Sequence, residues 1–378
     1  MKMKLLSLLL MTALVSCAQE NKKNAREYYL LLGTYTSGKS EGIYVYKFNS
    51  VTGDFSFVSS AKADNPSFLA VSPNEEFVYA VNENGNDKGS IAAYSFDNKT
   101  GQLNFLNKQS SGGDHPCYVN IDKSGKWVIG GNYSGGSLAV LQAMPDGKLL
   151  PATQVINHEG GSINKQRQEK PHVHSTVFSP DNKYLFVSDL GMDKIMIYPF
   201  DNTTGKLNPA SSSFAQIEPG GGPRHFTFDP PGNYAYLMEE MSGNVTVFSY
   251  DKKGKLTNIQ TISAIPSDYK GPIGSADIHV SPDGKFLYAS NRGESNTLAI
   301  FSIGNDGKLK LVGHQSTLGK TPRNFNIDPS GNFLLVANQN GNNVVIFKRD
   351  KQTGMLTPLE KQIEVPNPVC VKWASVGN

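Results

Sequence analysis

Cysteine is scarce in this sequence, and so are charged residues and helical patterning. The 378 residues include 3 cysteines, and charged side chains make up 18% of the chain. Beyond the N-terminus only Cys117 and Cys370 remain, and no Cys-x-x-Cys or Cys/His spacing indicates structural zinc. An exported location would permit a disulfide between these distant positions without requiring it. No long segment after the N-terminus repeats its apolar residues at helical spacing, which argues against a helical domain.

The charge balance gives no sign of a polyanionic partner. The chain has 36 basic and 33 acidic residues, and residues 1–16 contain two of the lysines. Without that segment, 34 basic residues face 33 acidic ones, which is a net charge of +1. Domains that bind nucleic acid or anionic membrane surfaces carry a clear basic excess. We therefore expect no nucleic-acid partner and no electrostatic contact with a membrane.

The N-terminal segment has the pattern of a signal peptide followed by a lipidation motif. Two lysines precede an apolar run over residues 5–15, which is too short for a permanent transmembrane helix. The sequence LVSC, which ends at Cys17, resembles the lipobox of bacterial lipoproteins and implies cleavage before Cys17 and acylation of its thiol. We expect residues 1–16 to be removed and residues 17–27 to form a flexible tether. The protein would then be a lipoprotein facing the periplasm or the cell surface; an accidental apolar start would instead leave it in the cytoplasm.

Glycine and aromatic residues are abundant, and they recur with a period of about 50 residues. A Gly-x-Leu or Gly-x-Phe turn occurs seven times, at Gly53, Gly101, Gly147, Gly205, Gly254, Gly307 and Gly354. Each turn joins an apolar and aromatic stretch such as IYVYKF or VTVFSY to another stretch that reads as a strand. Glycine supplies the positive φ that a tight hairpin needs.

A second landmark is a turn that begins with Ser or Asp, most often followed by Pro, between two further strands. It begins at Ser72, Asp122, Ser179, Asp229, Ser281 and Asp328. An apolar stretch such as FVYAV or FLYAS follows each copy. Each unit thus contains four strands, and four strands in a repeat of roughly 40–50 residues are the signature of a β-propeller.

The first unit lacks its opening strand, and the C-terminus supplies one. The chain enters the repeat at YYLLLGTY (residues 28–35), whereas PNPVCVKW (residues 366–373) matches the opening strands of the other units. Pairing of the two ends would close the ring and remove free sheet edges. The sequence therefore predicts an all-β fold, one seven-bladed β-propeller over residues 28–378, whose C-terminal strand joins the N-terminal blade. We expect it to be a monomer.

Equivalent positions of the repeat separate the scaffold from the candidate site, because the scaffold should require one residue type in every blade. Eleven residues after each Ser/Asp landmark, in what we call the strand-end column, the type varies: Glu83, Tyr133, Leu190, Glu240, Arg292 and Gln339. The column just before it is nearly uniform and typical of turn chemistry: Asn82, Asn132, Asp189, Glu239, Asn291 and Asn338. Five residues before each landmark, in the inner-strand column, the type varies again: Ser67, Cys117, His174, Arg224, Ala276 and Arg323, with Val369 from the closing strand.

Equivalent positions on inner strands form a ring around a propeller axis. His174, Arg224 and Arg323 should therefore converge near one mouth of the channel. Glu240 and Arg292 lie at loop ends that should open on the same face. These five side chains make up the predicted centre of the site.

The other histidines are expected in supporting positions. His172 shares the strand parity of His174 and should lie at the rim of the same funnel, and His115 occupies the same column as His172. By the same parity, His225 should point to the side of the strand opposite Arg224, which it follows. His279 should pack between blades. Interior histidines of this kind are most often simply hydrogen-bonded.

A cluster of arginine, glutamate and histidine suits hydrolysis of a lactone that carries an anionic group. Arginine binds carboxylate or phosphate and can stabilise an oxyanion. Glu240 could act as general base on water, and His174 could donate or accept a proton near neutral pH, so the identity of the base stays open. No Gly-x-Ser-x-Gly nucleophile elbow is present, which favours direct attack by water.

A metal centre is not expected. Two histidines on one strand, His172 and His174, need a third ligand to hold zinc, and neighbouring arginines disfavour a cation. Calcium needs several carbonyl and carboxylate ligands, whereas the site columns are cationic. We expect no metal and no other cofactor.

Four stretches resemble the lactonase family of seven-bladed propellers: PHVHSTVFSPDNKYLFVSD, GGPRHFTFDPPGNYAYLMEE, SADIHVSPDGKFLYASNRGES and TPRNFNIDPSGNFLLVANQN. This family includes bacterial 6-phosphogluconolactonases of propeller type and fungal carboxy-muconate lactonizing enzymes, and the similarity spans essentially the whole mature chain. It implies catalytic and anion-binding roles for His174, Arg224, Glu240 and Arg292. Related lactonases often have Asn-Glu where this chain has Glu239-Glu240, so Glu239 is an alternative to Glu240.

The resemblance and the site columns together predict hydrolysis of an aldonolactone by water, with 6-phosphogluconolactone as the leading substrate. The partner is then a small lactone molecule. Four further residues are expected to bind substrate: Arg323, His172, Tyr133 and Glu83. The alternative is a non-catalytic exported propeller that binds an anionic ligand or a protein.

Overall fold

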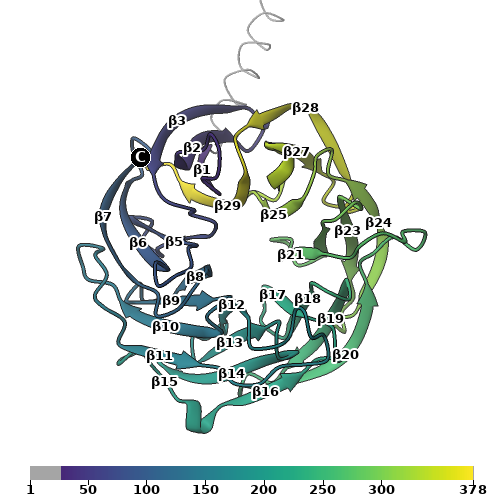
Figure 1. Ribbon diagram of the computed structural model, residues 1–378. Helices are drawn as coiled ribbons and strands as arrows, with labels where there is room; N and C mark the ends of the chain where they lie inside the picture. The colour runs from purple at the N-terminus through teal and green to yellow at the C-terminus, as the bar shows by residue number, and fades with distance from the viewer. Residues whose placement is uncertain (1–26, 378) are drawn as a thin grey trace, which may run out of the picture.

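Each unit of the repeat folds into an antiparallel sheet, and seven sheets stand around one axis (Figure 1). The computed structural model describes residues 27–377. Apolar and aromatic stretches form the strands because such side chains pack well on a pleated surface, and glycine turns join them. The predicted seven-bladed, all-β propeller is confirmed. No helix among residues 27–377 is both long and apolar enough to cross a membrane.

The blades are numbered along the chain, and the strands of each are given from the axis outwards. Blade 1 has β29 (Pro368–Ser375), β1 (Glu27–Thr34), β2 (Gly42–Asn49) and β3 (Phe55–Lys62), and blade 2 has β4 (Leu69–Val71), β5 (Phe77–Asn82), β6 (Ser90–Asp97) and β7 (Gln102–Ser110). Blade 3 has β8 (Pro116–Ile121), β9 (Trp127–Asn132), β10 (Ser137–Gln142) and β11 (Gln154–Asn157). Blade 4 has β12 (Val173–Phe178), β13 (Tyr184–Asp189), β14 (Lys194–Asp201) and an outer edge split into β15 (Lys206–Leu207) and β16 (Ser213–Gln216) around the 3-10 helix η1 (Pro209–Ser211).

The remaining three blades follow the same order. Blade 5 has β17 (Pro223–Phe228), β18 (Tyr234–Glu239), β19 (Asn244–Tyr250) and β20 (Leu256–Ser263), and blade 6 has β21 (Ser275–Val280), β22 (Phe286–Asn291), β23 (Thr297–Ile303) and β24 (Leu309–Ser316). Blade 7 has β25 (Pro322–Ile327), β26 (Phe333–Asn338), the 3-10 helix η2 (Gln339–Gly341), β27 (Asn343–Arg349) and β28 (Leu356–Glu364).

The two ends of the described chain meet in blade 1, as the sequence predicts. β29 pairs antiparallel with β1 along its length, with Leu30 opposite Trp373. The Trp373 ring packs against Phe48 of β2, with ring centroids 5.1 Å apart. In Figure 1 the yellow β29 lies on the axis side of the purple β1 and β2. The last strand thus completes the first blade and leaves the ring without an open joint.

The recurrent glycines are required by the fold on two grounds. Gly307 has a φ of 77°, a conformation that favours glycine. A Cβ atom at Gly307 would also lie 2.3 Å from the ring of Tyr234 in the preceding blade. The Tyr236 hydroxyl donates a hydrogen bond to the Gly307 carbonyl at 3.0 Å. Each glycine turn of this kind therefore fits beneath an aromatic ring of its neighbour and fixes the two blades together.

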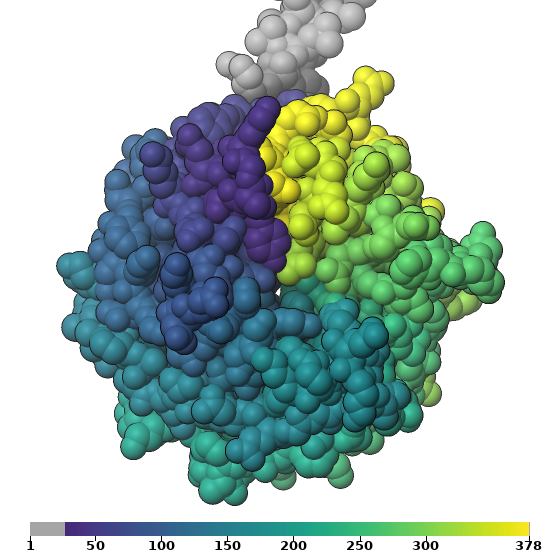
Figure 2. All heavy atoms as spheres, viewed as in Figure 1, coloured from purple at the N-terminus to yellow at the C-terminus, as the bar shows by residue number. Residues whose placement is uncertain are grey.

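The propeller has two unlike faces. At one end, here called the turn face, lie the turns between the first two and the last two strands of each blade. At the other end, the loop face, lie the loops between the second and third strands and the connections between blades. Figure 2 shows that side chains fill most of the central space that the ribbons of Figure 1 leave open.

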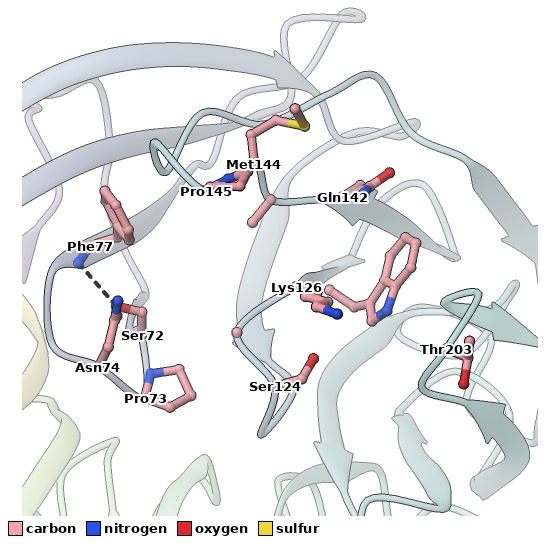
Figure 3. Close-up of a pocket in the computed structure, with 13 residues that line it drawn as sticks. Ser72, Pro73, Asn74, Phe77, Ser124, Lys126, Gln142, Met144, Pro145 and Thr203 are labelled. Atoms are coloured by element: carbon pink, nitrogen blue, oxygen red, sulfur yellow. Dashed lines mark hydrogen bonds between the residues drawn. The ribbon is translucent and has the colours of Figure 1, made fainter.

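A pocket of about 470 Å³ lies on the turn face between blades 2 and 3 (Figure 3). It is lined by residues of the turns at 72–77 and 124–127, by Met144 and by Thr203. Its lining includes Lys126 but no acidic side chain and no histidine. It therefore lacks a carboxylate or an imidazole for acid–base chemistry, and it lies at the end of the propeller opposite the two site columns.

Candidate active site

A β-bulge occurs in the inner strands at the position of the inner-strand column. The ladder to the second strand skips one residue at Cys117, His174, Arg224, Arg323 and Val369, and two at Ala276–Asp277. A bulge leaves its extra residue unpaired and changes the direction of the side chain. The bulge thus recurs from blade to blade and turns the side chains of the inner-strand column toward the axis near the loop face.

Glu240, which directly follows β18, is the centre of the candidate site. Its Oε2 atom lies 2.9 Å from Nε of Arg224 and 3.0 Å from Nη2 of Arg292. Its Oε1 atom accepts a hydrogen bond from Nη2 of Arg167 at 2.7 Å. Nε2 of His174 lies 3.7 Å from Oε2. The structure therefore brings His174, Arg224 and Arg292 together on one buried carboxylate, as the sequence predicts.

Two of the arginines are fixed by backbone carbonyls of blade 6. Arg224, which is 1% exposed, donates through Nη1 to the Ala276 carbonyl at 2.6 Å. Arg292 donates through Nε to the Gly274 carbonyl at 2.9 Å and through Nη2 to the Ser275 carbonyl at 3.2 Å. Rigid donors of this kind hold positive charge in place without reorganisation.

The arginine field keeps Glu240 ionised. Burial would raise the pKa of this carboxyl, but the charges of Arg292 and Arg224, with contributions from His174 and Arg167, outweigh burial and hold the pKa well below its usual range. The same environment acts on Arg292, whose pKa burial lowers to about 10. The guanidinium and the carboxylate are therefore both charged at neutral pH.

His174 is neutral at pH 7. Burial lowers its pKa well below the usual value, and the charge of Arg224 lowers it further. Its Nδ1 atom lies 3.7 Å from the buried Cys117 thiol, and its ring meets that of Tyr133 edge to face at 5.3 Å. The imidazole is thus held between blades 3 and 5, with Nε2 toward Glu240.

Tyr133 and His172 form one wall of the site. Their rings stack with centroids 4.5 Å apart, and Nδ1 of His172 lies 3.0 Å from the Tyr133 carbonyl oxygen. Nε2 of His172 lies 3.4 Å from a carboxylate oxygen of Glu169. The Tyr133 hydroxyl accepts a hydrogen bond from Arg167 at 3.1 Å. Tyr133 thus borders the Glu240 cluster directly, whereas His172, which is 6% exposed, supports Tyr133 from behind.

Arg323 and Glu83 belong to a second group, joined through a residue that the columns above omit. The Tyr35 hydroxyl donates to Oε2 of Glu83 at 2.8 Å, and the Ser67 hydroxyl donates to the same oxygen. The Arg323 guanidinium lies over the Tyr35 ring, 5.4 Å from its centroid. Four residues from blades 1, 2 and 7 therefore form a connected set beside the Glu240 cluster.

Two site residues, Arg167 and Tyr35, were missed by the sequence analysis. Arg167 lies in the connection over residues 158–172 between blades 3 and 4, which has no counterpart in the repeat. Its length, greater than that of the other connections, is the one available signal. Tyr35 directly follows β1, the second strand of blade 1, so it is the blade 1 member of the strand-end column. Extending that column across the ring closure would have found it.

Glu239 does not share the site with Glu240. Its carboxylate accepts hydrogen bonds from Ser242 at 2.5 Å and from Thr246 at 2.6 Å. Burial raises its pKa. Glu239 thus satisfies polar groups inside blade 5, which agrees with the structural role expected for its column.

The prediction for His225 was wrong in direction. Its ring packs against rings of other blades, edge to face with His174 at 5.5 Å and with Tyr118 at 5.4 Å. The bulge at Arg224 is the reason, because it breaks the alternation that strand parity assumes. His225 therefore faces the channel and helps to form the floor below the site.

Asp277 holds this floor together. It accepts hydrogen bonds from Nδ1 of His225 at 2.6 Å, from Nε2 of His279 at 2.9 Å and from the Asn324 amide. His279 packs edge to face on Phe325 in the next blade, at 5.0 Å. The expected supporting roles of both histidines agree with these contacts.

His115 stays outside the Glu240 cluster. It precedes β8 with a φ of 51°, and a Cβ atom at Gly85 would lie 2.6 Å from its ring.

Cys117 and Cys370 are both free and buried. Among residues 27–377, no group of three or more His, Cys, Asp or Glu side chains is placed to hold a metal ion. Cys17 and the predicted signal peptide lie outside the described residues.

Comparison with known proteins gives a consistent result. The family model described as "Lactonase, 7-bladed beta-propeller" matches residues 29–373. The 6-phosphogluconolactonases of Formosa agariphila and Bacillus subtilis are 41% and 39% identical to this chain, over 89% and 92% of its length and 96% and 98% of theirs. The structure of a periplasmic gluconolactonase from Pseudomonas aeruginosa superposes with a TM-score of 0.88 at 37% identity, over 93% of this chain and 100% of that one. The chain therefore belongs to the lactonase family of seven-bladed β-propellers.

Proposed function

We propose that this protein hydrolyses aldonolactones, above all 6-phosphogluconolactone, as an enzyme of carbohydrate metabolism. The observation that carries the proposal is the buried Glu240 carboxylate, which contacts three guanidinium groups beside the neutral imidazole of His174. Relatives named for 6-phosphogluconolactone and for gluconolactone hydrolysis support the substrate class.

In the proposed reaction, water attacks the lactone carbonyl carbon and the bond from that carbon to the ring oxygen breaks. Water loses its protons, the ring oxygen gains one, and the products are a carboxylate and a free hydroxyl with release of one proton. Negative charge develops on the carbonyl oxygen in the transition state. Arg224 and Arg292 are suited to stabilise it, because the carbonyls of blade 6 already hold their guanidinium groups in place.

Glu240 is the proposed acceptor of the water proton. Its Oε2 atom contacts Arg224 and Arg292, whereas Oε1 has the single partner Arg167 and keeps a free lone pair for water. Its low pKa makes it a weak base, which suffices for an ester as reactive as a sugar lactone. Neutral His174 carries one N–H and is the proposed donor to the ring oxygen.

The substitution Glu240→Gln tests the assignment. It should lower kcat/KM for 6-phosphogluconolactone by roughly 10²- to 10⁴-fold, because an amide cannot accept the proton. Hydrolysis is followed as acid release, with the spontaneous rate subtracted. Thermal unfolding of the variant is recorded as well, because the change leaves three arginines, two of them largely buried, without their carboxylate.

Glu239→Gln is the matched control. The side-chain amide introduced at position 239 can still form hydrogen bonds with Ser242 and Thr246, so this variant should keep its activity. Loss of activity in Glu239→Gln alone would reassign the base. A wild-type protein that leaves every lactone at its spontaneous rate would overturn the enzyme proposal in favour of a propeller that only binds an anion.

We further propose that the protein is exported and anchored through a lipid on Cys17. The support is the lipobox sequence and a relative described as periplasmic. In a bacterial host, the wild-type protein should partition into the detergent phase, and Cys17→Ala should appear in the aqueous phase with unchanged lactonase activity. Recovery of the wild-type protein in the cytoplasm with its first sixteen residues intact would contradict export.

A further inference from the structure

Arg323 differs from the other arginines of the site in that its donors are free. Arg167, Arg224 and Arg292 all pair with Glu240, and two of them also bind backbone carbonyls. The Arg323 guanidinium makes no hydrogen bond or ion pair with any residue from 27 to 377, and it is partly exposed. A guanidinium presents five N–H donors in a fixed fork that matches carboxylate or phosphate oxygens.

The position of this free guanidinium is nevertheless fixed. Arg323 lies on the Tyr35 ring at 5.4 Å, a cation–π contact. Glu83 holds the Tyr35 hydroxyl at 2.8 Å and is held in turn by Ser67. Tyr35 and Glu83 therefore act on Arg323 as positioning residues: the ring supports the guanidinium, and the carboxylate orients the ring.

Arg323 lies at the same level of the ring as two members of the Glu240 cluster, His174 and Arg224. It occupies the bulge of β25, at the ring position that His174 and Arg224 occupy in their own blades. Burial is the main cause that lowers the pKa of His174, Arg224 and Arg292, and the charge of Arg323 adds to the lowering for all three. Arg323 is therefore close enough to the Glu240 cluster for its charge to act on three members of that cluster.

The site as a whole has an excess of positive charge. Three guanidinium groups share the single carboxylate of Glu240, Arg323 has Glu83 nearby through Tyr35, and His174 is neutral, which leaves a net charge of +2. A phosphate monoester carries about −1.5 to −2 at pH 7 and offers three acceptor oxygens. An unsubstituted sugar lactone is neutral and leaves that charge unmatched.

We infer that Arg323, supported by Tyr35 and Glu83, forms the subsite that binds the phosphate group of a phosphorylated lactone and so sets the preference for phosphorylated over neutral substrates. This inference rests on the proposed lactonase function and adds a residue-level basis for its specificity. Glu83 then acts through Tyr35 and does not contact the substrate phosphate, which changes the role that the sequence analysis gave it.

The test compares kcat/KM for 6-phosphogluconolactone and for unphosphorylated gluconolactone. Arg323→Gln should lower the value for the phosphorylated lactone by roughly 10- to 100-fold and leave the neutral lactone within about threefold. Arg323→Lys keeps the charge but not the fork, so its loss should be smaller. Tyr35→Leu should reproduce part of the Arg323→Gln effect, mainly in KM for the phosphorylated substrate, whereas Tyr35→Phe keeps the ring and should lose less.

Three further arms complete the design. Lys126→Gln removes one positive charge on the turn face and should leave the ratio of the two kcat/KM values unchanged. A lactone with a carboxylate in place of the phosphate, a monoanion, should show a smaller dependence on Arg323. Calorimetric titration with 6-phosphogluconate should show weaker binding to Arg323→Gln and Arg323→Lys than to the wild-type protein.

The outcomes separate this inference from the proposed function. If Arg323→Gln slows both lactones equally, or neither, the phosphate subsite is wrong while the lactonase function stands. If the wild-type protein turns over no lactone, the proposed function fails; the titration then decides the subsite, because equal binding of 6-phosphogluconate by wild type and variants would overturn it as well.

Discussion

Glu240 is surrounded by more positive charge than one carboxylate can neutralise. Arg224 is buried, Arg292 is largely buried, and both donate hydrogen bonds to the backbone, whereas Arg167 reaches the same carboxylate from a surface connection with its side chain 44% exposed. The two kinds of contact should differ in strength, because water screens an exposed ion pair. Arg167 is therefore the partner of Glu240 that a substrate can most easily displace.

Arg167→Gln tests this residue. Burial would raise the pKa of Glu240, and Arg167 is among the groups that outweigh burial, so its loss should raise that pKa. The acid limb of the kcat/KM profile, where Glu240 becomes protonated, should move to higher pH, and kcat/KM at pH 7 should fall by roughly tenfold. Lactone hydrolysis measured from about pH 2 to 8 checks both effects, because the acid limb of the wild type lies below the usual carboxyl range.

Lys165→Gln is the control for that change. It removes a positive charge from an exposed residue of the same connection that makes no contact with Glu240. Its pH profile should match the wild type. An equal shift in both variants would mean that the net charge of the surface, and not the Arg167 contact, controls Glu240.

At the scale of the strand, variation between the repeats located the site better than strand parity did. Comparing blades singled out His174, Arg224, Glu240 and Arg292, and all four meet in the structure. Parity placed His225 on the wrong side, because pattern arguments assume a regular ladder and the bulge at this column breaks it.

Other parts of the site follow from tertiary arrangement and could not be derived from one unit of the repeat. Tyr35 belongs to the strand-end column, yet its blade is assembled from both ends of the chain and lacks the Ser/Asp landmark used for counting. Arg167 reaches blade 5 from a connection between blades 3 and 4, a contact that no spacing along the chain encodes. By contrast, the closure by β29 was predictable. The first unit lacks its opening strand and the C-terminus has one strand left over, so the two must pair to close the ring.

The whole molecule should lose stability in mild acid because of the floor below the site. Burial lowers the pKa of His225 to about 4, with a further contribution from Arg224. For Asp277, burial would raise the pKa, but His279 and His225 outweigh burial and hold it well below its usual range. The unfolded chain protonates histidine near pH 6.5, so the contribution of His225, about 3 kcal/mol, is fully present above that pH and is lost as the pH falls to about 4. The contribution of Asp277 is lost at still lower pH.

Urea unfolding at pH 7 and at about pH 4.5 measures this effect. The wild-type midpoint should be lower at acid pH, and His225→Gln should reduce the difference between the two midpoints. His174, whose pKa is also lowered by burial, should account for part of the remainder. His314→Gln, a change on the outer strand β24, serves as control. A wild-type midpoint independent of pH would contradict the argument.

The place where β1 begins has a consequence for how an anchored molecule meets its substrate. Glu27 lies at the turn-face end of β1, close to Tyr29, whose hydroxyl bonds the Lys99 carbonyl in a turn of that face. Glu240 and Tyr35 lie at the opposite end. If Cys17 carries the proposed lipid, the tether joins the ring at the turn face, and Glu240 lies at the opposite face. Soluble sugar lactones would then enter the site at the face that does not carry the tether.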